Sequence, residues 1–456
     1  MQRPTIFSLC LLLFLYSFNT AGSSVKKVSE SDTLPFEVSL QEALDYAVEH
    51  SITMRTARAD HEIAARQIKE ITATGLPQID ASLGYQYFLN IPTSLVPAQF
   101  FGGEPGEFAE IQFGTEQSMS ASATVSQLLF DGSYIIGLRA ARVYRDLASQ
   151  NIDRSELEIR NQVAETYFIV LLSRDNLSIT LKNLSNLEQT LNETEKILEA
   201  GFTDAINVDQ LRLSVSNLSN RITNMERQYE LSMHLLKFQI GLDLDRDIIL
   251  TDSLAGLFEK MLLEADVNEE FNPEDHIDYK VTLSQQNMSY MSLRRQQSFY
   301  LPTLTASFTH QEMAMRNQFD FANFSRPWFP SSFVAVNLNI PIFSSGLRSS
   351  RVQQARLELS KSEMATEEVA RSLNLQIKEA VSQYRTSMER YQDEKENLDL
   401  AERILSRTAI MHSEGMASSL ELTQANEQLL TTQANYYNAM FEFITAKNNL
   451  DKARGL

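Results

Sequence analysis

The stretch GLPQIDAS at residues 75–82 occurs a second time, in altered form, as YLPTLTAS at residues 300–307. Both copies place a Leu-Pro pair before a segment in which apolar residues alternate with small or polar ones. Because successive side chains of a β-strand point to opposite faces, each segment predicts a strand with one apolar face. A chain that contains such a strand twice is expected to repeat a larger unit around it.

The repeat extends well beyond these strands. The segment EAGFTDAINVDQL at 199–211 aligns with SEGMASSLELTQA at 413–425, and the same offset places Gly132 on Gly346. One offset held over about 100 residues indicates a duplicated structural unit. We therefore predict one repeat at 39–240 and another at 273–456, joined by an equatorial or linker segment at 241–272.

Each repeat is expected to contain a β-hairpin, at about 77–130 in the first and about 302–343 in the second. Strands with one apolar and one small-polar face are typical of a half-buried soluble sheet or of an outer-membrane barrel wall. The loops between the strands are rich in Phe, Gly and Pro and hold the only tryptophan, Trp328. Aromatic residues at strand ends favour a membrane interface, although a soluble binding loop is the alternative.

Four strands are too few to form a closed transmembrane barrel. Open sheet edges do not face lipid, because their backbone groups would lack hydrogen-bond partners, and the smallest barrels have about eight strands. The strands therefore predict an oligomer, and the pattern alone leaves two or three copies open.

The remaining sequence predicts long helices. Residues 133–200 and 347–414 each contain almost no helix breaker, and shorter return helices are expected at 203–240 and 417–453. Two further helices are expected at 39–74 and 273–298. Heptad-spaced apolar residues predict that each long helix and its return helix form a left-handed coiled coil. By length, we expect 273–298 to continue 203–240, and 39–74 to continue 417–453.

The first residues are typical of an export signal. Arg3 precedes an apolar run at 6–18 that is too short to span a membrane, and small residues follow, which predicts a signal peptide at 1–22. The only cysteine, Cys10, lies within that run, so we expect no structural disulfide. The formal net charge of -19 argues against nucleic acid as a partner.

Motifs for catalysis are weak. HEIAA at 61–65 is half of a zinc-protease motif without the second histidine. Two groupings of soft ligands, HQEMAM at 310–315 and IMHSEGM at 410–416, would suit Cu(I) or Ag(I), but neither has a firm ligand spacing and ordinary loop and coiled-coil methionines are the favoured interpretation.

Together, the Leu76-Pro77 and Leu301-Pro302 strand starts, the strand-to-helix turns LLFDG and PIFSSG, and the glycine-led tips closely resemble the TolC-like outer-membrane efflux protein family. The resemblance covers nearly the whole chain after the signal peptide. It implies a mainly α fold with a small β part and an internal two-fold repeat. In that fold, a long antiparallel coiled-coil α-barrel continues a trimeric 12-stranded transmembrane β-barrel, to which each chain contributes four strands.

The resemblance also implies a function without catalysis or a cofactor. Family members are homotrimeric exit ducts of tripartite efflux or type I secretion systems, set in the lipid of the outer membrane with a helical tunnel in the periplasm. They accept cargo from an inner-membrane pump, such as an RND or ABC transporter, through a periplasmic adaptor (membrane fusion) protein. A periplasmic or surface coiled coil with no conduit is the alternative for this chain.

Site residues follow from the same resemblance. The adaptor-docking tips would lie near 201–208 and 415–422, with these residues: Gly201, Ile206, Val208, Gly415, Leu420 and Leu422. Family members carry acidic residues at the periplasmic aperture, where this sequence has Glu421 and, at the next acidic place, Gln424. The usual arginine after the second tip glycine is Ala417 here, which puts a closed-state latch in doubt.

Overall fold

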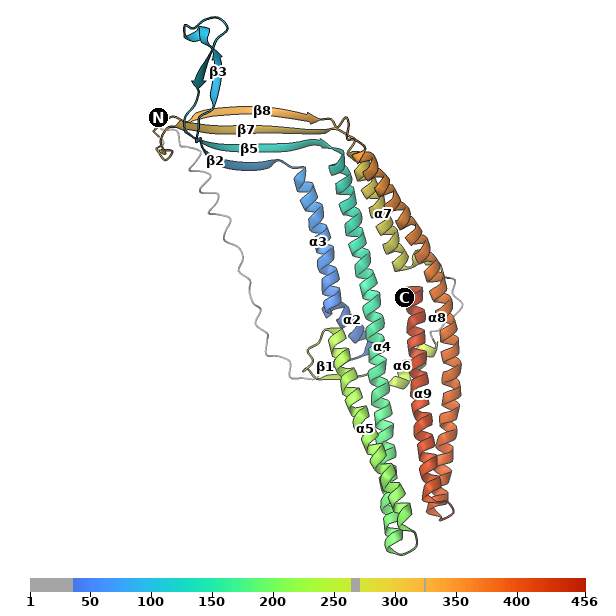
Figure 1. Ribbon diagram of the computed structural model, residues 1–456. Coiled ribbons are helices and arrows are strands. Elements are labelled where there is room, and N and C mark those ends of the chain that lie inside the picture. The colour runs from blue at the N-terminus through green and yellow to red at the C-terminus, as the bar shows by residue number, and fades with distance from the viewer. Residues whose placement is uncertain (1–35, 264–270, 324) are drawn as a thin grey trace.

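The computed structural model describes residues 36–263, 271–323 and 325–456, so the predicted signal peptide lies outside the described residues. A four-stranded sheet lies at one end of the molecule, and two helical hairpins run away from it to neighbouring tips (Figure 1). Within the described residues, no helix has both the length and the apolar character needed to cross a bilayer.

The two repeats contain equivalent elements. The first comprises α2 (Leu40–His50), α3 (Ile52–Thr74), β2 (Gln78–Tyr87), β5 (Gln117–Asp131), α4 (Gly132–Glu199) and α5 (Ala205–Ile240). The second comprises α7 (Ile277–Ser298), β7 (Thr303–Arg316), β8 (Phe329–Asn339), α8 (Leu347–Ser413) and α9 (Ser419–Arg454). The predicted long helices, return helices and four strands are therefore confirmed to within a few residues at most boundaries.

The long helices begin where the strands end. The Asp131 carboxylate accepts hydrogen bonds from the backbone N–H groups of Ser133 (2.6 Å) and Tyr134 (3.3 Å), which caps α4. Helix α4 has 68 residues and is therefore about 100 Å long. Helix α8 has 67 residues and begins after Gly346, whose φ of +86° suits glycine.

The sheet has the order β2-β5-β7-β8, and every neighbouring pair is antiparallel. Strand β5 of the first repeat pairs with β7 of the second, and this pairing joins the two hairpins into one sheet. Strands β2 and β8 form the two edges, and their outer backbone groups have no partner strand in the described chain.

Several small elements were not predicted. A second hairpin, β3 (Thr93–Pro97) and β4 (Phe108–Gln112) with the 3-10 turn η1 (Ala98–Phe101), stands away from the sheet (Figure 1). Strand β1 (Phe36–Val38) pairs in parallel with β6 (Ile248–Leu250), and α6 (Leu254–Leu263) follows. The 3-10 turn η2 (Pro273–Asp275) precedes α7. Side chains from β6 and α6 join the main core, so this part of the 241–272 segment is packed structure.

The expected stacking of the short helices was wrong. The His276 imidazole Nε2 lies 3.1 Å from the Lys452 carbonyl oxygen, which joins the start of α7 to the end of α9. A Cβ on Gly241 would lie 2.8 Å from the His50 carbonyl oxygen, so the end of α5 meets the α2–α3 junction. Each return helix is therefore continued by the helix that leads into its own repeat's hairpin. Helix lengths alone fitted either arrangement.

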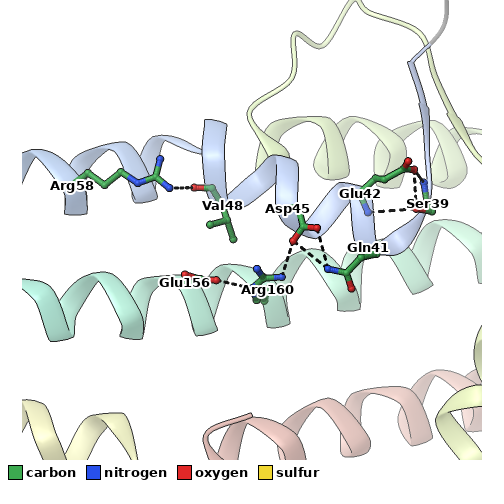
Figure 2. Close-up of polar contacts among 8 residues, drawn as sticks. All are labelled: Ser39, Gln41, Glu42, Asp45, Val48, Arg58, Glu156 and Arg160. Atoms are coloured by element: carbon green, nitrogen blue, oxygen red, sulfur yellow. Dashed lines mark hydrogen bonds and ion pairs between the residues drawn. The ribbon is translucent and has the colours of Figure 1, made fainter.

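The predicted helix at 39–74 is broken at Ser51. The Ser51 backbone leaves the helical region, and its hydroxyl caps α3 by accepting from the Met54 N–H at 3.3 Å. The Arg58 guanidinium donates to the Val48 carbonyl at 3.0 Å, which satisfies the end of α2 (Figure 2). On the side of α2 that faces α4, Asp45 forms an ion pair with Arg160 at 3.2 Å (Figure 2).

The core follows the helical body in two clusters. The larger one surrounds Phe443, which is fully buried, and includes Tyr384, Tyr391 and Phe258. The smaller one joins both hairpins near the tips, through residues such as Leu187, Leu218 and Leu422. A buried amide, that of Gln433, hydrogen-bonds Asn183 at 3.2 Å and Asn176 at 3.3 Å and thereby joins α9 to α4.

Candidate functional site

The sheet presents two chemically different faces. Directly paired residues share a face, and the row Ile79, Val125, Phe308 and Val334 crosses all four strands. We call this side the apolar face, and its members include Ala81, Leu83, Met119, Ala121, Ala123, Leu304, Ala306, Val336 and Leu338. Val334 is 72% exposed and Ile79 75% exposed, so nothing in the described chain covers this row of the apolar face.

The other side, here called the polar face, carries hydroxyl and amide groups. Its members include Ser82, Ser118, Ser120, Ser122, Thr124, Ser307, Thr309, Gln311, Ser331 and Asn337. Cross-strand hydroxyl pairs join neighbouring strands, with Ser82 2.8 Å from Ser122 and Thr124 3.0 Å from Thr309. An apolar face opposite a hydroxyl face is the arrangement of a barrel wall with lipid on one side and water on the other.

An aromatic cluster closes the outer end of the apolar face. The Tyr85 ring contacts Phe319 and Phe321 of the β7–β8 loop, with centroid distances of 5.6 and 5.9 Å. On β7, the charged or polar residues His310 and Glu312 interrupt the apolar face shortly before the strand enters this loop. Of the predicted loop aromatics, Phe319 and Phe321 thus lie where an interfacial girdle would be needed, whereas Phe100 and Phe101 belong to the β3–β4 hairpin that stands away from the sheet.

The two hairpin tips have the same turn geometry. At the first tip, the Phe202 N–H donates to the Ile197 carbonyl, and at the second, the Met416 N–H donates to the Met411 carbonyl. Each turn passes through a glycine of positive φ, +81° at Gly201 and +73° at Gly415. Both are Schellman motifs, in which the left-handed residue is glycine because a Cβ would be strained there.

The predicted docking residues divide into two groups. Ile206 and Leu420 are 63% and 49% exposed, whereas Val208 and Leu422 are buried between the helices. The exposed pair, with Phe202 at 84% exposure, can contact a partner directly. The buried pair supports the tips from inside.

Glu421 has a local structural role at the second tip. Its carboxylate accepts hydrogen bonds from the Ser418 backbone N–H at 2.7 Å and from the Ser418 hydroxyl at 3.0 Å, forming a capping box at the start of α9. These hydrogen bonds lower the pKa of Glu421. Gln424 lies one turn later and is also exposed. The sequence carries the signal for this cap, Ser-x-x-Glu at 418–421.

We expect Ser418→Ala and Glu421→Ala to loosen the first turn of α9, because each removes half of the capping box. For Ser418→Ala the loss is about 1 kcal/mol. Amide hydrogen exchange at 419–422 should become faster in both variants, and Gln424→Ala is the control. The pKa of Glu421 is lowered, so its contribution to the stability of the first turn of α9 is present at neutral pH. That contribution is lost as the pH falls through the lowered pKa. Unchanged exchange in both variants would contradict the capping role.

The structure separates the candidate ligands of the first methionine and histidine grouping. His310 lies on the apolar face, whereas Met313 and Met315 lie on the polar face. His412 lies 3.2 Å from the Ser419 hydroxyl and closes the second hairpin, and burial lowers the pKa of His412. The described part of the chain contains no group of three His, Cys, Asp or Glu residues placed to hold a metal ion.

Comparisons with known proteins agree with this architecture. The family model for outer membrane efflux proteins matches residues 43–241 and 290–456. The chain is 20% identical to outer membrane protein TolC of Salmonella enteritidis, over 88% of this chain and 79% of that protein. It is 22% identical to the probable outer membrane lipoprotein SilC of Salmonella typhimurium, over 90% and 84% of the two chains. The structure of CusC superposes with a TM-score of 0.70 at 15% identity, covering 95% of each chain.

The family match covers most of the chain, and the structural likeness extends from the sheet to the tips. The relatives are named as outer membrane proteins. The chain therefore belongs to the outer membrane efflux protein family and is a protein of the outer membrane.

Proposed function

We propose that this chain is the outer-membrane exit duct of a tripartite efflux or type I secretion system. Three copies would close one barrel and one helical tunnel, through which cargo passes without chemical change. A periplasmic adaptor would deliver that cargo from an inner-membrane pump such as an RND or ABC transporter. The observation that supports this most strongly is the open sheet with one apolar and one hydroxyl face.

The open edges are suited to closure by further copies. The strands alternate in direction across the sheet, so the edges β2 and β8 run antiparallel to each other. Strand β2 of one copy can therefore pair with β8 of the next and continue the same antiparallel pattern. Closure removes both rows of unpaired backbone groups, which a hydrocarbon environment requires.

The tips are suited to contact with the adaptor. Phe202, Ile206 and Leu420 expose apolar side chains at the far end of the hairpins, about 100 Å from the sheet. Exposed apolar groups gathered at one end of a long helical body are typical of a contact surface. Cross-linking from a cysteine at position 206 tests this, and absence of any cross-linked envelope protein would contradict it.

The conduit is tested by detergent purification, native mass and conductance in a planar bilayer. We expect a trimeric mass and discrete single-channel currents. The only cysteine in the sequence is Cys10, in the predicted signal peptide, so single cysteines can be introduced cleanly. A charged water-soluble thiol reagent should reduce the current of Ser120→Cys, on the polar face, and leave that of Ala121→Cys unchanged.

Other outcomes would decide against the proposal. A species that is soluble without detergent and gives no current would favour the non-conducting coiled coil. A dimeric mass would contradict three copies while leaving a barrel possible. An equal reduction of the current in both cysteine variants would contradict the assignment of the polar face to the water-filled side.

A further inference from the structure

The strands of the four-stranded sheet contain very little charge. Strands β2, β5, β7 and β8 have 10, 15, 14 and 11 residues, and only four of those residues carry a formal charge: Asp80, Asp131, Glu312 and Arg316. The whole chain of 456 residues, by contrast, is 22% charged. Nearly all of its charge therefore lies outside the sheet.

Two of these four charges already have structural partners. Asp131 is the N-cap of α4 and accepts two backbone hydrogen bonds. Arg316 is 7% exposed, lies 3.2 Å from the Asp320 carboxylate and donates to the Pro327 carbonyl at 3.0 Å. Both are compensated locally, so neither presents a strong field to a passing solute.

The remaining two carboxylates lie on opposite faces. Asp80 is exposed on the polar face, where its cross-strand partner is Thr124. Glu312 pairs across the strands with Ala121 on the apolar face, and its Oε1 lies 3.8 Å from His310 Nε2. The polar face therefore has one uncompensated carboxylate on a surface of mainly hydroxyl and amide groups, interrupted on β8 by Phe329 and Phe333.

From this distribution, and resting on the proposed conduit, we propose that the barrel wall passes hydrated solutes of either charge, and that Asp80 is its one charge-sensing residue. Hydroxyl and amide groups turn oxygen lone pairs toward cations and O–H or N–H donors toward anions, and they hydrogen-bond neutral polar solutes as well. One carboxylate per copy adds a weak preference for cations. Strong selection by charge then falls to the helical part of the tunnel.

Salt concentration determines how visible this preference is. At 0.1 M salt the Debye length is about 10 Å, so a wall carboxylate is largely screened from the centre of a wide pore. At 0.01 M salt the Debye length is about 30 Å, and the field of Asp80 extends across the lumen. The effect of Asp80 should therefore appear at low salt and fade at high salt.

The test compares Asp80→Asn with Glu312→Gln, which are matched losses of one carboxylate on opposite faces. The permeability ratio of potassium to chloride is measured from the reversal potential under a gradient between 0.01 and 0.03 M potassium chloride. We expect Asp80→Asn to lower the ratio about twofold and Glu312→Gln to leave it unchanged. Ser120→Lys, on the polar face, should shift the ratio further toward anions.

Each alternative result has a definite meaning. If the wild-type channel conducts and Asp80→Asn leaves the ratio unchanged, Asp80 does not sense charge and the inference is wrong, whereas the conduit stands. A shift in Glu312→Gln alone would place the apolar face on the water-filled side and overturn the inference. If the wild-type protein gives no current in any salt, it is the proposed conduit that fails.

Discussion

Replacing Val334 with arginine is expected to prevent stable assembly in the outer membrane. Val334 is 72% exposed in the row of Ile79, Val125 and Phe308, which crosses the apolar face. Arginine on the lipid-facing side of a barrel costs about 2–4 kcal/mol at the bilayer midplane, and the cost recurs in every copy. Membrane fractionation and native mass of the detergent extract should show little or no trimer.

The neighbouring residue provides the control. Ala335 follows Val334 on the same strand but lies on the polar face, so Ala335→Arg should reach the membrane and form trimers. Its conductance should fall, because the added side chain occupies the water-filled side. Equal assembly of the two variants would show that the two faces do not differ in environment.

Replacing Phe443 with alanine is expected to cause the largest loss of stability among single truncations in the helical body. Phe443 is fully buried, and its ring lies 5.3 Å from Tyr384 and 5.4 Å from Phe258. Truncating a buried phenylalanine costs about 3–5 kcal/mol, since it removes apolar contacts and leaves a cavity. Thermal unfolding followed by circular dichroism in detergent should show a clearly lowered Tm.

Phe202→Ala is the matched control for this truncation. Phe202 is 84% exposed at the first tip, so its removal should leave the Tm unchanged. A Tm for Phe443→Ala equal to the wild-type value would mean that the aromatic cluster is not part of the stabilising core. Under the proposed function, any effect of Phe202→Ala belongs to adaptor binding.

Much of the fold could be predicted because its signals are local. The long helices contain no proline and, apart from Gly132 and Gly137 near the start of α4, no glycine; the strands keep a period of two, and the tip glycines occupy equivalent places in both repeats. The stacking of the short helices could not be predicted, since it depends on contacts such as His276 with Lys452, far apart in sequence. The pairing of β1 with β6 is equally non-local.

Other features were missed because their local signals are weak. Ser51 interrupts a helical pattern without changing its apolar spacing, although serine is a good cap. Strand β3 ends in Pro97 and is only five residues long, which makes it hard to distinguish from a loop. For the tips, the sequence indicated the correct turns, and the structure shows that Ile206 is exposed whereas Val208, a member of the heptad-spaced apolar residues, is buried.

The junction between α9 and α7 has a mechanical consequence. Helices α4 and α8 are continuous covalent rods, whereas α9 and α7 meet end to end through the hydrogen bond of His276 and close contact with Gly455. Such an end-to-end, non-covalent contact resists compression but offers little resistance to tension or torsion. Pulling or twisting forces applied at the tips are therefore transmitted to the sheet mainly along α4 and α8.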